Sequence, residues 1–132
     1  MSDKYVYLDS SAFAKLVMVE PESPALSRFL DGRPLQAAAT LLRTEVLRAA
    51  MRVSQAHVAR ARQLLTTVAF IDLDRSLLDH AGILLPPDTR SLDAVHVAAA
   101  LALGDDLGEF VTYDRRLATA AHQWGIAVVS PA

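Results

Sequence analysis

The feature that most constrains this chain is a repeated alternation between short apolar runs and longer helical segments. Candidate strands of about four or five residues alternate with segments whose apolar residues recur at helical spacing. The candidate strands are 4–8, 36–39, 69–73, 109–113 and 126–129. Such alternation is typical of a parallel sheet with helices on both faces. We therefore predict an α/β fold, a three-layer α/β/α sandwich with a mainly parallel central sheet.

Length and composition limit the remaining possibilities. A chain of 132 residues has the length of one domain, so we predict a single domain over residues 1–132. It contains no cysteine, which excludes disulfide frameworks, cysteine-ligated zinc sites and thiol nucleophiles. No apolar run approaches the ~20 residues of a membrane span, and the N-terminus lacks a signal-peptide pattern. We expect a cytoplasmic protein with no membrane partner.

The charge balance bears on nucleic-acid binding. The net charge of −2 argues against a general nucleic-acid coat protein, which normally carries a large positive excess. A local basic stretch is nevertheless present over residues 43–62, with arginines at 43, 48, 52, 60 and 62 and a single acidic residue. This stretch is either a solvated helix surface or a phosphate-binding flank, and the sequence leaves both interpretations open.

Four carboxylates occupy positions where the local pattern favours another residue type. Asp9 and Asp114 each end an apolar strand, and ligands of parallel sheets gather at the carboxyl ends of the strands. Glu45 and Asp93 lie on or beside the apolar faces of two predicted helices. Each also has a purely structural explanation. The two strand-end aspartates can cap helices, Asp93 can complement a helix dipole, and Glu45 can pair with a neighbouring arginine.

Considered together, the four carboxylates are expected to converge on one edge of the sheet. Converging like charges in a partly buried site are costly unless a cation neutralises them. Without cysteine or a pair of histidines the ligands would be oxygen atoms, which suit Mg²⁺ or Mn²⁺. Carboxylates that hold a divalent ion commonly serve phosphodiester hydrolysis. The residues therefore indicate a metal-dependent nuclease or phosphotransfer site.

Two other functions of α/β proteins are inconsistent with the residues after the first strand. Dinucleotide binding requires a glycine-rich turn there, and residues 9–12 contain no glycine. A phosphatase of the haloacid-dehalogenase type requires a second aspartate two positions after Asp9, where this chain has Ser11.

The residues resemble the PIN-domain ribonucleases, and among these the VapC toxins of bacterial toxin–antitoxin pairs. The resemblance rests on four segments in order: Tyr7-Leu8-Asp9-Ser10-Ser11-Ala12, Thr44-Glu45-Val46, Ser91-Leu92-Asp93-Ala94-Val95-His96 and Val111-Thr112-Tyr113-Asp114-Arg115-Arg116-Leu117. It covers essentially the whole chain. Each segment alone is a weak signal, whereas four in the correct order are a specific one.

The resemblance implies a PIN fold and an endoribonuclease that depends on Mg²⁺ or Mn²⁺. The acidic quartet of the family carries over onto Asp9, Glu45, Asp93 and Asp114. By the same resemblance Asp9, Asp93 and Asp114 are the expected metal ligands, directly or through water. Glu45 is expected to help hold the metal or to orient the attacking water.

Further site residues follow the quartet. The supporting hydroxyl groups of the family carry over onto Thr112 and onto Ser10 or Ser11. Arg115 and Arg116, just past the last aspartate, are predicted to contact RNA phosphate. His96 could approach a metal or transfer protons, but a hydrogen-bonded core or rim residue is the simpler interpretation.

The resemblance also implies partners. These are an RNA substrate, commonly tRNA or rRNA, a cognate VapB-type antitoxin, and a second copy of the chain in a homodimer. The alternative function is a non-catalytic PIN-like module that binds RNA or protein through the same surface. The intact acidic quartet favours the enzyme.

Overall fold

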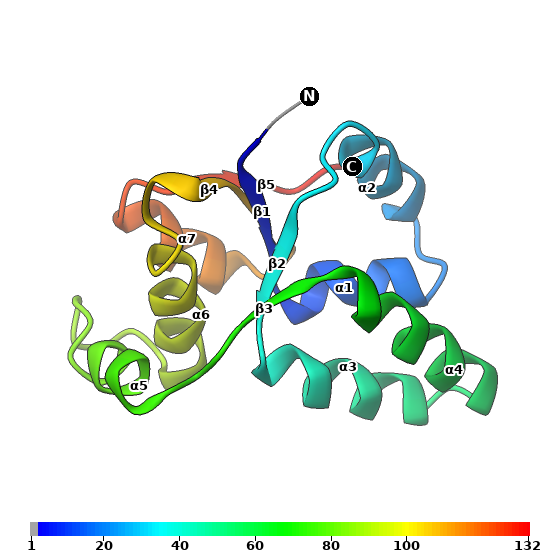
Figure 1. The fold of residues 1–132 in the computed structure, drawn as a ribbon, viewed down its shortest axis with the longest axis horizontal. Coiled ribbons are helices and arrows are strands. Elements are labelled where there is room, and N and C mark those ends of the chain that lie inside the picture. Colours follow the sequence, from blue (N-terminus) through cyan, green and yellow to red (C-terminus); the bar gives the residue numbers. More distant parts are fainter. Residues whose placement is uncertain (1–2) are drawn as a thin grey trace.

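The structure is a computed structural model in which residues 3–132 are described, and within them strands and helices alternate as predicted (Figure 1). The strands are β1 (Tyr5–Leu8), β2 (Gln36–Ala39), β3 (Ala69–Ile71), β4 (Leu107–Val111) and β5 (Ala127–Val129). The helices are α1 (Ser10–Val17), α2 (Ser23–Leu30), α3 (Leu41–Met51), α4 (Gln55–Leu64), α5 (Arg75–Gly82), α6 (Ser91–Leu101) and α7 (Arg115–Gln123).

The strands form one sheet in the order β3-β2-β1-β4-β5, and every neighbouring pair is parallel. The chain builds β1, β2 and β3 outward in one direction and then places β4 on the other side of β1. The strand order therefore reverses between β1 and β4. In open parallel sheets the crevice outside the carboxyl ends of such a strand pair is the usual ligand site.

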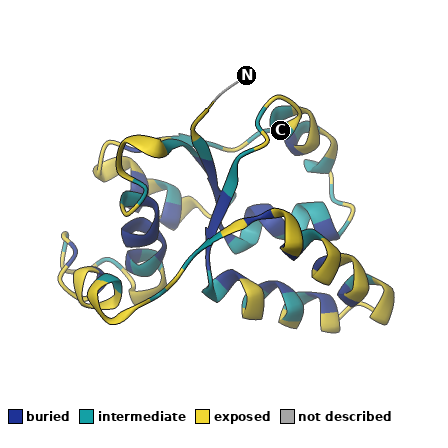
Figure 2. Ribbon diagram, viewed as in Figure 1, coloured by how far each residue is buried: buried dark blue, intermediate teal, exposed yellow. Residues whose placement is uncertain are grey.

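Helices cover both faces of the sheet, which confirms the predicted three-layer α/β/α sandwich. Helices α1 to α4 lie on one side of the sheet and α5 to α7 on the other (Figure 1). Each layer has its own apolar core, and the buried residues line the sheet and the inward sides of the helices (Figure 2). Along β1, Val6 and Leu8 enter the first core and Tyr7 the second, because successive side chains of a strand point to opposite faces.

One strand boundary differs from the prediction in a way that affects the site. The strand predicted over 109–113 is β4, Leu107–Val111, so Thr112 lies just past its end, where its side chain faces Asp9. Helix α6 begins at Ser91, and Arg90 holds the cap position without a capping hydrogen bond from its side chain. No helix among residues 3–132 has both the length and the apolar character needed to cross a membrane.

Candidate active site

Asp9 lies between β1 and α1 and is only 3% exposed. Its Oδ1 accepts a hydrogen bond from the backbone N–H of Ala12 at 2.9 Å and thereby caps α1. Its Oδ2 accepts from the Thr112 hydroxyl at 2.7 Å, and Ser11 Oγ lies 2.8 and 2.9 Å from the two carboxylate oxygens. Burial raises the pKa of Asp9 against the opposing effect of these hydrogen bonds and of the nearby His96. The capping and the site interpretations of Asp9 are therefore compatible.

Two hydroxyl groups tie Asp9 to the segment that follows β4. Ser11 Oγ accepts a hydrogen bond from the backbone N–H of Tyr113 at 2.9 Å, and Thr112 Oγ1 accepts from the backbone N–H of Asp114 at 3.0 Å. Because a hydroxyl both donates and accepts, each can serve the Asp9 carboxylate and a backbone N–H together. The network fixes the carboxyl end of β1 relative to Asp114.

Glu45 is half-buried on α3 and is held by two side chains from other elements. Its Oε1 accepts a short hydrogen bond from Ser10 and lies 3.6 Å from His96 Nε2. Burial raises the pKa of Glu45, but the hydrogen bonds from His96 and Ser10 and the charge of His96 outweigh it, and the net pKa is lowered. Ser10 and Ser11, which the sequence did not distinguish, thus have separate roles: Ser10 contacts Glu45 and Ser11 contacts Asp9.

His96 is buried in α6, as expected of a hydrogen-bonded core or rim residue. Its Nδ1 lies 2.8 Å from the hydroxyl of Tyr7, a buried residue of β1. Either atom can donate in this contact, depending on which imidazole nitrogen carries the proton. The other ring nitrogen, Nε2, faces Glu45. Burial raises the pKa of Tyr7 far above its usual range, so the hydroxyl stays protonated.

Asp93 and Asp114 form the outer part of the site. Asp93 lies in the first turn of α6, and Asp114 caps α7 by accepting from the backbone N–H groups of Arg116 and Leu117 at 2.9 and 3.2 Å. Burial and then the charge of Asp114 raise the pKa of Asp93. The charges of these two carboxylates therefore interact.

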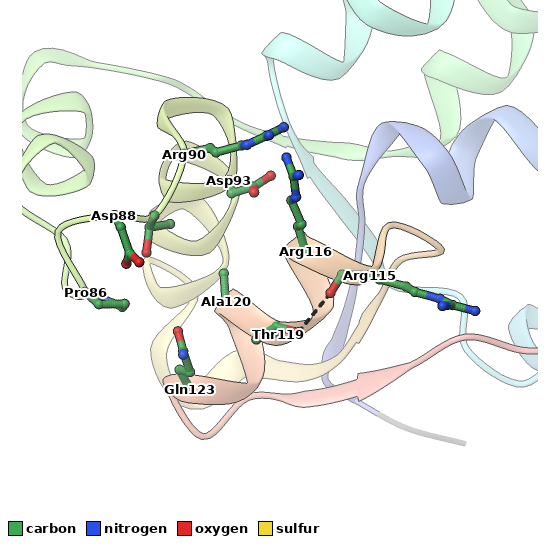
Figure 3. Close-up of a pocket in the computed structure, with 10 residues that line it drawn as sticks. Pro86, Asp88, Arg90, Asp93, Arg115, Arg116, Thr119, Ala120 and Gln123 are labelled. Atoms are coloured by element: carbon green, nitrogen blue, oxygen red, sulfur yellow. Dashed lines mark hydrogen bonds between the residues drawn. The ribbon is translucent and has the colours of Figure 1, made fainter.

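A pocket of about 550 Å³ opens beside Asp93, between the loop that precedes α6 and helix α7. Figure 3 shows the side chains of Arg90 and Arg116 pointing toward Asp93, whereas that of Arg115 extends away from it. None of the ion pairs formed among residues 3–132 involves these three arginines. Arg90 was missed by the sequence reasoning, although its place directly before the helix that carries Asp93 could have drawn attention to it.

The donor set is chemically suited to Mg²⁺ or Mn²⁺, because it consists of carboxylate and hydroxyl oxygens. Within the described part of the chain, no three His, Asp or Glu side chains are grouped closely enough to enclose one ion. Mg²⁺ does not require such a cage, since it usually binds one or two carboxylates and keeps several waters. Asp93 and Asp114, whose charges interact, are two carboxylates of the kind that such binding uses. Asp9 already uses both oxygens in hydrogen bonds.

The chain is similar to known proteins in both sequence and fold. The sequence matches the family described as PIN domain over residues 6–123. Ribonuclease VapC46 of Mycobacterium tuberculosis is 44% identical over 126 residues, which are 96% of this chain and 97% of that protein. A crystal structure of Mycobacterium tuberculosis VapC20, described as a sarcin-ricin loop cleaving toxin, has a TM-score of 0.74 at 21% identity and covers 96% of this chain and 99% of that one.

A second solved structure has the same fold. It is a toxin–antitoxin complex from Klebsiella pneumoniae, with a TM-score of 0.72 at 19% identity, covering 96% of this chain and 98% of that one. At these identities the two structures establish likeness of fold alone. The family match and the identity to VapC46 confirm the resemblance noted in the sequence, and the chain belongs to the PIN-domain family, among its VapC-type members.

Proposed function

We propose that this protein is a divalent-metal-dependent endoribonuclease and acts as the toxin of a VapBC-type pair. The observation that carries the proposal is that Asp9, Glu45 and Asp93, from three distant segments, each interact electrostatically with His96, and that Asp93 interacts in turn with Asp114. Support also comes from the 44% identity to a protein named ribonuclease VapC46. The proposed substrate is RNA, with tRNA and rRNA as the first candidates.

Each acidic residue has a proposed role that follows from its surroundings. Asp93 and Asp114 are the proposed direct ligands of Mg²⁺ or Mn²⁺, because they are the pair whose mutual repulsion a cation relieves. Buried Asp9 acts on the ion through water and holds the segment after β4 in place. Glu45, whose lowered pKa keeps it ionised, accepts a hydrogen bond from the attacking water and orients it. When bound, the ion lowers the pKa of that water and stabilises negative charge on the phosphate.

The chain's own basic and hydroxyl groups complete the proposed site. Ser10 and His96 fix the carboxylate of Glu45. Arg115 and Arg116 are the phosphate contacts proposed from the sequence, and the direction of Arg116 toward Asp93 favours it as the nearer of the two (Figure 3). These residues position substrate and water, and the acidic quartet performs the chemistry.

We also propose the partners of a VapC toxin: a VapB-type antitoxin, and a second copy of the chain in a homodimer, in the cytoplasm. The antitoxin is supported by the fold shared with the toxin–antitoxin complex from Klebsiella pneumoniae. The alternative function, a PIN-like module that binds RNA or protein without cutting, is tested by the experiment below.

The test is RNA cleavage by the purified, partner-free protein, with a panel of tRNA and rRNA and with Mg²⁺, Mn²⁺ or EDTA. Asp93→Asn keeps the shape of the side chain and removes its charge, and we expect it to lower cleavage by about 100-fold or more. Asp74→Asn, the same change at the exposed cap of α5, is the matched control and is expected to cleave like the parent. Cleavage by the parent protein in EDTA would contradict the proposal. So would a parent protein that cleaves no RNA of the panel, if Asp93→Asn binds RNA as tightly as the parent does.

A further inference from the structure

The pocket beside Asp93 has the size of a small-ligand site. Its volume of about 550 Å³ falls in the range typical of pockets that hold one small molecule. Such a space accommodates a single nucleotide, whereas a double helix is recognised over a much longer surface. The pocket is continuous with the acidic site, because Asp93 belongs to its wall.

One end of the pocket is built to hold an anion. The guanidinium groups of Arg90 and Arg116 both point toward Asp93 (Figure 3). They come from different elements, the loop before α6 and the first turn of α7, so two donors approach the same space from two sides. Neither side chain forms an ion pair or a hydrogen bond within residues 3–132, although the charge of Arg90 acts on Asp93 and opposes the rise of its pKa. Guanidinium groups whose donors are unpaired are well suited to a phosphate, whose oxygens match their fork of donors.

The other end of the pocket offers different chemistry. Pro86 and Ala120 present apolar surface suited to the flat face of a base. Asp88 and Gln123 add polar groups, and neither side chain forms a hydrogen bond within the described part of the chain. A carboxylate only accepts hydrogen bonds, so Asp88 favours a base edge rich in donors, and guanine, with adjacent N1–H and N2–H₂ groups, is the best match.

We propose that this pocket is a subsite for one unpaired nucleotide of the RNA, with its phosphate between Arg90 and Arg116 and its base against Pro86, Asp88 and Gln123. The inference rests on the proposed function and extends it, because it places substrate selection in the loop before α6. RNA is generally read in this way at unpaired positions, where a base can leave its stack and present its edge. The structure thereby assigns Asp88 as a specificity-determining residue and Arg90 as a phosphate ligand.

The test uses nucleotides as probes and needs no cleavage. GMP, AMP, CMP, UMP and inorganic phosphate are titrated separately into ¹⁵N-labelled, metal-free protein, and amide shifts are followed by NMR. We expect shifts centred on Arg90, Arg116 and Gln123, with GMP binding more tightly than UMP or phosphate. Arg90→Gln and Arg116→Gln are each expected to weaken GMP binding about tenfold.

Two matched variants make the outcome decisive. Arg75→Gln removes the same charge at an exposed position of α5 outside the pocket, and is expected to weaken GMP binding by less than about twofold. Asp88→Asn is expected to abolish the preference for GMP over the other nucleotides. Equal losses for Arg75→Gln and Arg116→Gln, or equal affinities for GMP and phosphate, would overturn the subsite. Because no step depends on cleavage, failure of the ribonuclease proposal would be recognised separately in the cleavage assay.

Discussion

Among single residues, His96 has the most specific position in the site. It reaches Tyr7 on one side and Glu45 on the other, so the buried hydroxyl of β1 determines which imidazole nitrogen faces the carboxylate. Since the pKa of Glu45 is lowered by His96, the imidazole keeps Glu45 ionised and fixed in direction. His96 is thus a positioning residue.

Replacing His96 by Gln is expected to raise the pKa of Glu45, because the hydrogen bond and the charge that lower it are both weakened. Cleavage is expected to fall about tenfold through kcat, with KM little changed, since the imidazole does not face the proposed nucleotide pocket. Titration of the Glu45 carboxyl by ¹³C NMR and steady-state kinetics on a short RNA measure the two effects. His80→Gln, at an exposed position of α5, is the control. If the pKa of Glu45 is the same in His96→Gln as in the parent, His96 does not position Glu45.

The raised pKa of Asp93 gives a stability prediction with a definite sign. In the folded protein the proton of Asp93 is held more tightly than in the unfolded chain, first because of burial and then because of Asp114. Its contribution to stability is therefore fully present below the unfolded pKa, about 4, and is lost as the pH rises through the folded pKa.

Without metal, Asp93→Asn is expected to be more stable than the parent at pH 7, and this advantage is expected to shrink as the pH falls toward about 4. Urea denaturation in EDTA at several pH values measures the difference in the free energy of unfolding. If the gain in the free energy of unfolding is the same at every pH, the ionised Asp93 carboxylate is not the cause of the gain. Added Mg²⁺ is expected to stabilise the parent more than the variant.

Among the elements, three helices begin with the same residue type for different purposes. Asp9, Asp74 and Asp114 cap α1, α5 and α7 with their side chains, but only the first and last lie at the acidic site. The positions of these caps were predictable, because each aspartate directly precedes a helical pattern and follows a strand or the short segment after one. The cap pattern cannot by itself separate a structural aspartate from a functional one.

Substitutions at two of these caps are expected to separate the roles. Asp74→Ala removes a capping acceptor and is expected to cost about 1 kcal/mol of stability without affecting cleavage. Asp114→Asn retains a good capping residue and is expected to keep stability within about 0.5 kcal/mol while cleavage is lost. Urea denaturation and the RNA cleavage assay measure both quantities on both variants. Loss of cleavage in Asp74→Ala would indicate that α5 takes part in the site.

The errors at the level of elements have local causes. Thr112 and Tyr113 have strong strand propensity and extended the predicted strand, but the N–H groups of Tyr113 and Asp114 bond to the hydroxyls of Ser11 and Thr112. Serine is a residue type that favours the cap position, yet Ser91 is already helical and the extended Arg90 holds the cap of α6. The strand and helix propensities of single residues do not reflect hydrogen bonds between segments that are distant in the sequence.

At the scale of the whole molecule, the site follows from topology. Once the sheet is parallel, carboxylates after β1 and β4 must meet at one edge, so convergence of Asp9 and Asp114 was predictable. The Tyr7–His96 contact and the position of Arg90 at the pocket were not predictable, because both depend on how α6 packs against the sheet. The sequence therefore identified the acidic residues but not all the residues around them.

The distribution of charge over the molecule bears on the two interpretations of residues 43–62. The five arginines of this stretch are all exposed, four on α3 and α4 and Arg52 at the C-cap of α3, across the sheet from α6 and α7 (Figure 1). Arg60 donates to the carbonyl of Leu16, and Arg43 lies over the ring of Phe70 at 5.0 Å. These contacts favour a solvated helix surface. On the proposed function, the pocket on the other side of the sheet would then supply most of the phosphate contacts.

This view predicts a weak salt dependence for RNA binding. Each phosphate neutralised on single-stranded RNA contributes about −0.7 to the slope of log K against log salt, so three contacts from Arg90, Arg115 and Arg116 give a slope of about −2.1. Fluorescence anisotropy with a short labelled RNA in EDTA, between low and moderate salt, measures the slope. The double variant Arg90→Gln with Arg116→Gln is expected to flatten the slope to about −0.7, and Arg48→Gln with Arg52→Gln to leave it unchanged. A slope steeper than about −3, or flattening by the second pair, would instead place the RNA backbone along α3 and α4.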